Sequence, residues 1–248
     1  MSIIAQLKSV HLLELRARLL KSISVIMVVF LALLYYSNDI YDFVAKPLID
    51  LLPEGASMIA TDVATPLLSP LKLTIMVSFF LAIPYVLYQL WAFVMPGLYG
   101  HEKKIVSPIF FCSVFLFYAG VAFAYLFVFP LIFSFFTNAA PAGVVIATDI
   151  SSYLDFVLTL FLVFGLAFEV PVVVIILCWT GICTPQDLKK KRPYVIVWMF
   201  IIAMLVTPPD IFSQTLIAIP MCLLWEFGVL CAGLYCTEPS EVKIDAGG

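Results

Sequence analysis

The sequence is poor in charge. Only 12% of its 248 residues are Asp, Glu, Lys or Arg, against roughly a quarter in a soluble domain. Neither 73–100 nor 105–148 contains any of these residues. A membrane-spanning helix needs about 20 such residues, so the sequence excludes an ordinary soluble domain and predicts an all-α polytopic membrane protein. The net charge of −3 argues against a nucleic-acid partner.

The sequence also lacks the residue patterns of common catalytic and metal sites. It contains two histidines, no glycine followed by lysine, and no CxxC, GxGxxG, GxSxG or HExxH pattern. Its six cysteines lie within apolar runs or at their ends, and we interpret them as small packing residues. We therefore expect no enzyme activity, no cofactor and no metal. Any energy source would be the membrane potential or a proton gradient.

Six apolar spans are predicted between the charged segments. They cover 22–38, 73–100, 105–130, 153–179, 194–207 and a segment that begins near 211. The first follows Lys21 without a small-residue cleavage site, so we expect it to remain as a helix. Spans five and six are predicted to be short. No internal repeat is visible, which counts against the inverted-repeat plan of many secondary transporters. We expect one domain over 1–236 and a disordered cytoplasmic tail over 237–248.

The basic residues predict the orientation. Eleven of the thirteen Lys and Arg residues fall in the N-terminal arm, the second and fourth loops and the tail, which six spans place on one side. Lys46 and Lys72 fall on the other side, among several acidic residues. The excess of positive charge marks the cytoplasmic side, so both termini are predicted to be cytoplasmic.

Two outer segments are longer than simple connections. In 38–53, Ile40, Val44, Leu48 and Leu51 recur at helical spacing, which predicts a short amphipathic helix on the outer face. The second outer segment, 136–152, is rich in Ala, Pro and Gly.

Two acidic residues are predicted at the cytoplasmic interface. Glu14 precedes span one, and Glu102 follows span two. The simpler interpretation is an i,i+4 pair of Glu14 with Arg18 and a charged turn at Glu102. Together, however, two carboxylates on one face can bind a ligand with two guanidinium groups, because Arg pairs bidentately with a carboxylate.

Glu169 is predicted to lie inside the membrane. It follows Asp155 by 14 residues, which corresponds to about 21 Å of helix. Pro171 cannot donate to the helix ladder, so the pattern predicts a broken helix beside a polar cavity. The alternative is a protonated, hydrogen-bonded structural glutamate.

The hairpin between spans five and six is a further candidate site. Pro208 and Pro209 end span five, and Asp210 is predicted to be the N-cap of span six. Met204, Thr207 and Gln214 place polar or polarizable atoms near the hairpin, as contact with a partner helix in the membrane would require. The alternative is a hairpin that packs within the molecule.

Several of these segments together resemble a known family. The matching stretches are HLLELRARLL, MIATDVATP, LYQLWAFVMPGLYGHEKK, FEVP, KKKRPYV and VTPPDIFSQTLIAIP. In this order on a six-span chain, they resemble TatC, the multispanning core subunit of the bacterial twin-arginine protein translocase. The resemblance covers about residues 10–235.

The resemblance implies a function and named site residues. It implies a cytoplasmic receptor for twin-arginine signal peptides of folded proteins, in the bacterial inner membrane. The binding site would comprise Glu14, Glu102, Arg16, Arg18, Trp91 and Phe93. It also implies that transport is driven by the proton-motive force, without ATP. Ala17 departs from the family, in which close relatives carry a third basic residue.

The resemblance also implies partners. Met204, Thr207 and Gln214 match the residues that contact the single-helix subunits TatA and TatB, and an oligomeric complex with TatB is expected. The residue matching Glu169 faces a concave groove inside the membrane. The alternative function is a proton-coupled small-solute transporter that uses Glu169. An intramembrane hydrolase would need a nucleophile–base pair, which the sequence does not offer.

Overall fold

The computed structural model describes residues 3–50, 57–59, 64–94, 103–139, 147–207 and 210–235. Almost all of these residues are helical, and the predicted all-α class is confirmed. The tail over 237–248 lies outside the described residues. In chain order the elements are α1 (Ile3–Leu33), η1 (Leu34–Tyr36), α2 (Ser37–Asp50), β1 (Ser57–Ile59), α3 (Thr65–Val94), α4 (Lys103–Phe123), η3 (Ala124–Val128), α5 (Phe129–Ala139), β2 (Ala147–Asp149), α6 (Ile150–Trp179), α7 (Pro185–Lys190), α8 (Arg192–Val206) and α9 (Ile211–Tyr235).

The six predicted apolar segments are helical wherever the structure describes them, except at Thr207, which caps the fifth in an extended conformation. Five helical stretches of the described chain are long and apolar enough to cross a membrane: Leu12–Phe43, Thr65–Phe93, Ser107–Phe136, Ile150–Trp179 and Ile211–Leu234. The fifth predicted span corresponds to α8, which has 15 residues and a length of about 22 Å. The prediction of a short sixth span is wrong, because α9 has 25 residues and continues past Pro220.

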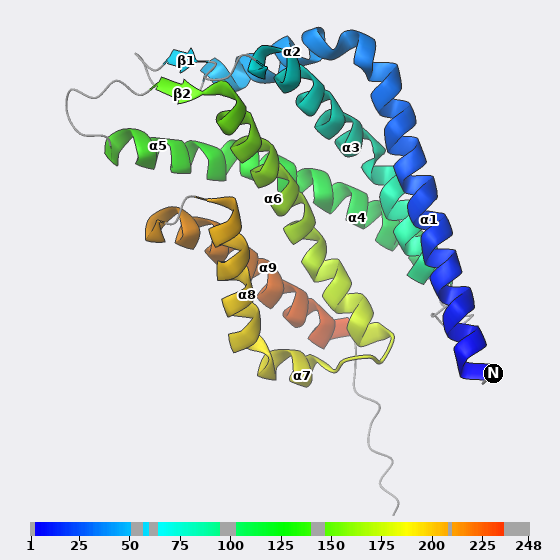
Figure 1. The fold of residues 1–248 in the computed structure, drawn as a ribbon. Coiled ribbons are helices and arrows are strands. Elements are labelled where there is room, and N and C mark those ends of the chain that lie inside the picture. The colour runs from blue at the N-terminus through cyan, green and yellow to red at the C-terminus, as the bar shows by residue number, and fades with distance from the viewer. Residues whose placement is uncertain are drawn as a thin grey trace, which may run out of the picture.

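Helix α6 lies at the centre of the molecule (Figure 1). It packs against α4 on one side and α9 on another, and it also contacts α3. Its residues contribute to each of the three clusters of buried apolar side chains. Val157, Leu160 and Phe164 have no exposed surface at all.

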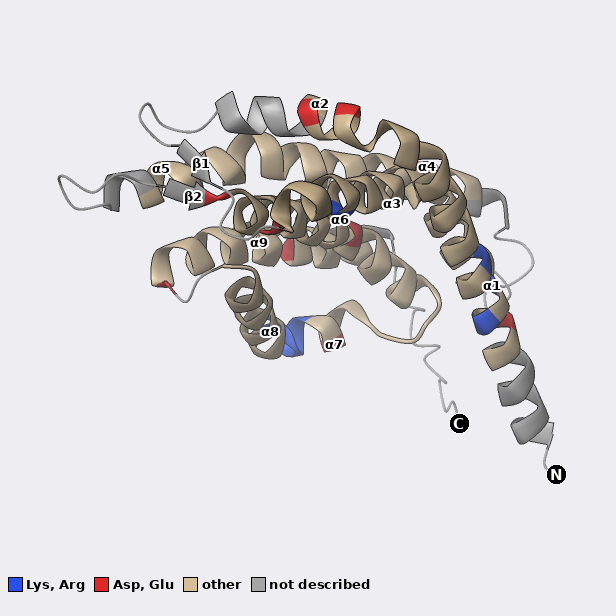
Figure 2. Cartoon of the chain, turned by 45° about the horizontal axis from the view of Figure 1, so that its top comes forward, with Lys and Arg blue, Asp and Glu red and all other residues tan. Residues whose placement is uncertain are grey.

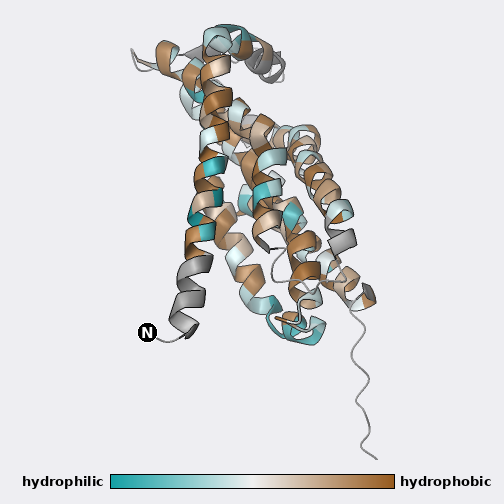
Figure 3. Ribbon diagram, turned by 90° about the vertical axis from the view of Figure 1, so that its right-hand side faces the viewer, coloured by the Kyte–Doolittle hydropathy of each residue, from teal (hydrophilic) through white to brown (hydrophobic). Residues whose placement is uncertain are grey.

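Helix α1 lies at the edge of the molecule. It runs alongside α3, and α2 continues from it across the end of α3 (Figure 1). Most of its outward side chains are apolar and exposed, including Met27, Val28 and Leu31. Figure 3 shows the hydrophilic residues of this helix in its N-terminal part and the apolar ones beyond. Such a surface fits a helix that faces lipid.

Two glycines permit close contact between helices around α6. A Cβ atom at Gly120 of α4 would lie 2.5 Å from the Phe164 carbonyl oxygen of α6, and one at Gly228 of α9 would lie 2.8 Å from Cα of Pro171. Any larger side chain would push these helices apart. Small residues are favoured at helix contacts in membranes because they let two backbones approach closely.

The predicted break at Pro171 is wrong. Helix α6 continues as an α-helix from Ile150 to Trp179 with Pro171 inside it. Proline inside a membrane helix is tolerated where neighbouring groups compensate for the lost hydrogen bond. Here α9 packs directly against this position through Gly228.

Helices α4 and α5 are joined by a π-helical segment, η3. Pro130 follows it, and its ring would clash with the carbonyl of Leu126 four residues earlier in a regular helix. A wider π turn at Ala124–Val128 accommodates this clash. This segment was not predicted from the sequence, although Pro130 was visible.

The outer segments meet at one end of the molecule. The predicted amphipathic helix is confirmed as α2. β1 and β2 form a parallel pair, with Ser57 opposite Ala147 and Ile59 opposite Asp149. An ion pair between Lys72 of α3 and Asp155 of α6 links the helices near this end. The strand pair was not predicted, because three residues are too few to show an alternating pattern.

Candidate functional site

Glu14 lies in the N-terminal part of α1 and binds a guanidinium group of its own chain. Nη2 of Arg18 donates to Oε1 of Glu14 over 2.6 Å, and Nε of Arg18 donates to the same oxygen over 3.1 Å. The i,i+4 spacing places both side chains on one face of the helix. The two side chains are 33% and 24% exposed for Glu14 and Arg18, so water reaches this pair. The i,i+4 ion pair of Glu14 with Arg18, which was the simpler interpretation of the sequence, is therefore present in the structure.

The same guanidinium reaches α3. Nη1 of Arg18 donates to Oε1 of Gln89 over 3.4 Å. Gln89 is buried, with 6% of its surface exposed. It was not among the residues predicted from the sequence. The sequence could have indicated Gln89 as a site residue, because it is an amide within an uncharged apolar run. Polar side chains in such runs usually have a specific partner.

The other residues of the predicted binding site differ in exposure, and one of them is not described. Glu102 lies outside the described residues. Arg16 is exposed on α1. Trp91 is buried against the apolar cluster of α3, α4 and α6, and Phe93 is partly buried. The structure thus brings Glu14 and Arg18 together and adds Gln89.

Glu169 is buried between α6 and α4, with 8% of its surface exposed. The Ser113 hydroxyl of α4 is a polar group beside it. Neither Oγ of Ser113 nor Oε1 of Glu169 meets a hydrogen-bond partner among the described residues. A buried polar atom without a partner is costly and requires a reason.

The hairpin between α8 and α9 is held by several hydrogen bonds. The Asp210 carboxylate accepts from the Ser213 backbone N–H over 2.7 Å, which confirms the predicted N-cap. The Gln214 amide donates to the Phe200 carbonyl of α8 over 3.0 Å. Pro208 and Pro209 lie outside the described residues.

The three predicted partner-contact residues differ in exposure. Met204 is 49% exposed, while Thr207 is buried and its hydroxyl donates to the Ala203 carbonyl. Gln214 is partly buried and bonds within the hairpin through its nitrogen. Met204 and the partly exposed Gln214 are therefore the parts of this set that an approaching helix could reach.

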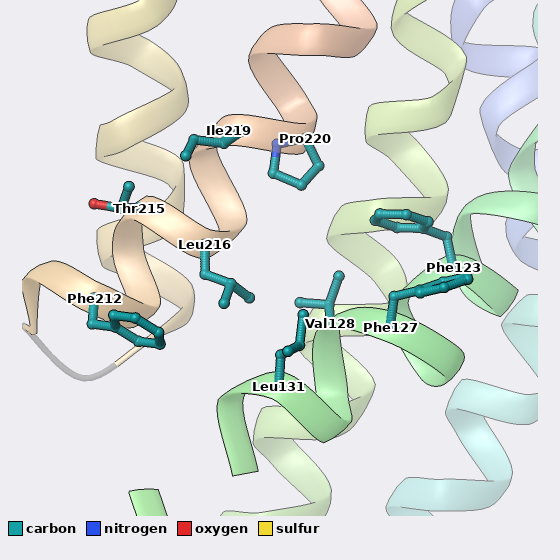
Figure 4. A pocket seen from close by; sticks show the side chains of 9 residues that line it. All are labelled: Phe123, Phe127, Val128, Leu131, Phe212, Thr215, Leu216, Ile219 and Pro220. Atoms are coloured by element: carbon teal, nitrogen blue, oxygen red, sulfur yellow. The ribbon is translucent and has the colours of Figure 1, made fainter. Parts of the chain in front are cut away.

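An apolar groove of about 320 Å³ lies between the end of α4, η3, α5 and the first half of α9 (Figure 4). Its walls are Phe123, Phe127, Val128, Leu131, Phe212, Thr215, Leu216, Ile219 and Pro220. The Thr215 hydroxyl donates to the Ile211 carbonyl over 2.6 Å, so the groove is apolar in character. Glu169 is not among the lining residues. The resemblance implied a groove at Glu169, and this groove lies elsewhere.

The end of the molecule opposite the strand pair carries most of the described basic residues (Figure 2). A capping box of Thr184 and Asp187 begins α7. Hydrogen bonds from the Thr184 hydroxyl and backbone lower the pKa of Asp187 below its ordinary value. Arg192 donates to Glu226 over 2.6 Å and joins the start of α8 to α9.

Among the described residues, no group of three or more His, Cys, Asp or Glu side chains could hold a metal ion. The polar groups at the candidate sites are the Glu14 carboxylate with its bound guanidinium on α1, the buried Glu169 carboxyl on α6 and the hydrogen-bonded hairpin of α8 and α9.

Comparison with known proteins decides the family. The profile of the family described as "Sec-independent protein translocase protein (TatC)" matches residues 10–220. The chain belongs to the TatC family. It is 60% identical over 234 residues to the TatC protein of Haemophilus influenzae, a match that covers 94% of this chain and 91% of that protein. It is 57% identical over 225 residues to TatC of Escherichia coli (strain K12), covering 91% and 87% of the two chains.

A solved TatC structure has the same fold. The crystal structure of a twin-arginine translocase receptor TatC superposes with a TM-score of 0.82 at 35% identity, covering 90% of this chain and 98% of that one. This TatC-family protein is therefore a core subunit of a protein translocase and not an enzyme. It is a multi-pass helical protein of the inner membrane.

Proposed function

We propose that this TatC-family protein is the receptor for signal peptides that carry a consecutive arginine pair on folded proteins. Glu14 and Glu102 each take one guanidinium group at the cytoplasmic face. Arg16, Arg18, Trp91 and Phe93 surround them. The similarity to a solved twin-arginine translocase receptor supports this role.

The observation that carries the proposal is the guanidinium already bound to Glu14. Two N–H groups of Arg18 converge on one oxygen of this carboxylate. A charge-assisted contact of this kind is the interaction that an arginine of a peptide would make. The carboxylate is partly exposed in the N-terminal part of α1, so a peptide can reach it.

The distribution of charge supports an orientation with both termini in the cytoplasm. Arg16, Arg18 and Lys21 lie in the first part of α1, and the basic run that ends α7 lies at the same end of the molecule (Figure 2). Asp39 and Asp42 of α2 lie at the opposite end. Positive charge accumulates on the cytoplasmic side of membrane proteins.

We further propose that TatA and TatB, the single-helix subunits, contact the hairpin of α8 and α9, and that the protein works in an oligomeric complex with TatB. The helix α8 is about 22 Å long against a hydrocarbon core of about 30 Å. A short helix favours recruitment of neighbours. The proton-motive force drives transport.

A proton-coupled small-solute transporter is the competing interpretation, with Glu169 as the coupling group. Such a transporter binds its substrate at a polar site near the middle of the membrane. Glu169 is buried, and the groove between η3, α5 and α9 is apolar and does not contain it. No observation favours this function over the receptor.

The receptor proposal is tested with a photo-crosslinkable twin-arginine signal peptide added to inside-out membrane vesicles. We expect Glu14→Gln and Glu102→Gln each to reduce crosslinking to this protein about tenfold, because each removes a charged hydrogen-bond partner. The double variant should abolish it. A twin-lysine peptide should crosslink weakly to the wild type, because lysine cannot bind a carboxylate bidentately.

Glu226→Gln is the matched control. It also removes a carboxylate that pairs with an arginine at the basic end, but this pair joins α8 to α9 and does not lie on α1. It should leave crosslinking intact. If the double variant still crosslinks at the wild-type level, the receptor assignment is wrong.

The partner proposal is tested by co-purification of TatB. We expect Gln214→Leu to reduce the bound TatB severalfold while peptide crosslinking persists, because the side chain can no longer hydrogen-bond across helices. Ser213→Ala is the control, since the Ser213 hydroxyl is buried without a described partner. Unchanged TatB recovery with Gln214→Leu would contradict the contact.

A further inference from the structure

We propose that Arg18 is an internal competitor for the guanidinium site of Glu14. In the resting protein it occupies that site, and it must leave when a signal-peptide arginine binds. The inference rests on the proposed receptor function and adds a role for Arg18 that differs from direct contact with the peptide.

The geometry shows that one oxygen of the Glu14 carboxylate is already occupied. Both contacts of Arg18 converge on Oε1 of Glu14, at 2.6 and 3.1 Å. A second guanidinium at the same carboxylate would lie beside the first, and two positive groups at that separation repel each other. Binding of an external arginine therefore favours departure of Arg18.

The structure also provides a place for the displaced side chain. Gln89 of α3 already accepts from Nη1 of Arg18 over 3.4 Å. Its amide oxygen is neutral and buried, and burial makes the loss of its donor costly. The guanidinium can therefore release Glu14 and keep Gln89. Because α1 packs along α3, this movement requires only side-chain rotation.

The expected effect is modest. The Glu14–Arg18 pair is an i,i+4 pair with both side chains partly exposed. Pairs of this kind are weak, so displacement of Arg18 should reduce the peptide affinity only about two- to fivefold. Displacement of Arg18 thus lowers the affinity for the signal peptide but does not prevent binding.

The test is the dissociation constant of a fluorescent twin-arginine signal peptide for the full-length protein in nanodiscs. Arg18→Gln frees Glu14 and should tighten binding about two- to fivefold. Lys21→Gln removes the same charge from an exposed position of α1 outside the proposed site and measures the general electrostatic gain. A gain from Arg18→Gln larger than that from Lys21→Gln supports the inference. Equal gains, or weaker binding in Arg18→Gln, overturn it.

Gln89→Met adds a second and independent readout. It removes the acceptor for displaced Arg18, so it should weaken peptide binding when Arg18 is present. In the Arg18→Gln background it should have no effect. A purely structural role of Gln89 would weaken binding equally in both backgrounds, and that result would contradict the inference.

Glu14→Gln separates the two proposals. If it weakens binding about tenfold while Arg18→Gln brings no specific gain, the receptor function stands and the competition is wrong. If Glu14→Gln leaves the dissociation constant unchanged, Glu14 is not the peptide site and both proposals are overturned.

Discussion

Helices α1 and α6 are nearly equal in length, with 31 and 30 residues, yet their surroundings are opposite. In the most apolar stretch of each span, 6% of the residues are buried for the span Leu12–Phe43, which contains most of α1, and 56% for α6. Both are apolar enough to cross a membrane. Lipid tails are as apolar as protein side chains, so hydropathy alone does not separate a central helix from a peripheral one.

The two helices accordingly have different roles. α6 contributes to all three buried clusters and holds the other helices in place. α1 is free of that task for most of its length, and its N-terminal part carries Glu14 and Arg18 in contact with water. A peripheral, partly exposed position suits a binding residue, because an incoming peptide can reach it without disturbing the core.

Matched leucine-to-alanine substitutions test this comparison with the largest expected effect on stability. Leu160 of α6 has no exposed surface, whereas Leu31 of α1 is 61% exposed. We expect Leu160→Ala to lower the free energy of unfolding by about 3 kcal/mol, because it leaves a cavity in close packing. Leu31→Ala should change it by less than about 0.5 kcal/mol. Unfolding in mixed micelles measures both, and equal losses would show that α1 is as central to stability as α6.

Matched glycine substitutions sharpen the comparison with a smaller effect. A Cβ at Gly120 would lie 2.5 Å from a backbone oxygen of α6, whereas one at Gly233 of α9 meets nothing within 4 Å. We expect Gly120→Val to cost about 2 kcal/mol through overpacking against α6. Gly233→Val should leave the stability unchanged. Thermal unfolding in detergent measures the stability of both variants. Similar stabilities of the two variants would contradict the close contact of α4 and α6.

Local features were predicted well from the sequence. The N-cap at Asp210, the amphipathic helix α2 and the pair of Glu14 with Arg18 depend on residues three or four positions apart. Such interactions are set by helix geometry, which the sequence pattern reveals directly. The roles of Trp91, Phe93, Met204, Thr207 and Gln214 remain predictions.

Features that join distant segments were missed or wrong. Gln89 is 71 positions from Arg18, and β1 pairs with β2 across 90 positions. The predicted break at Pro171 is absent, and Gly228, far along the chain, packs against this proline. None of these contacts produces a periodic signal in the sequence.

By itself, the sequence determined that this protein consists of apolar helices in a membrane. The scarcity of charge sufficed, because a backbone inside lipid must satisfy its own hydrogen bonds and a helix does so within one segment. Only the tertiary structure decided which helix is central and which carries the exposed carboxylate. The position of each helix depends on the shape of the surfaces in contact, such as Gly120 against Phe164. In a membrane, helices associate through close packing and not through the hydrophobic effect.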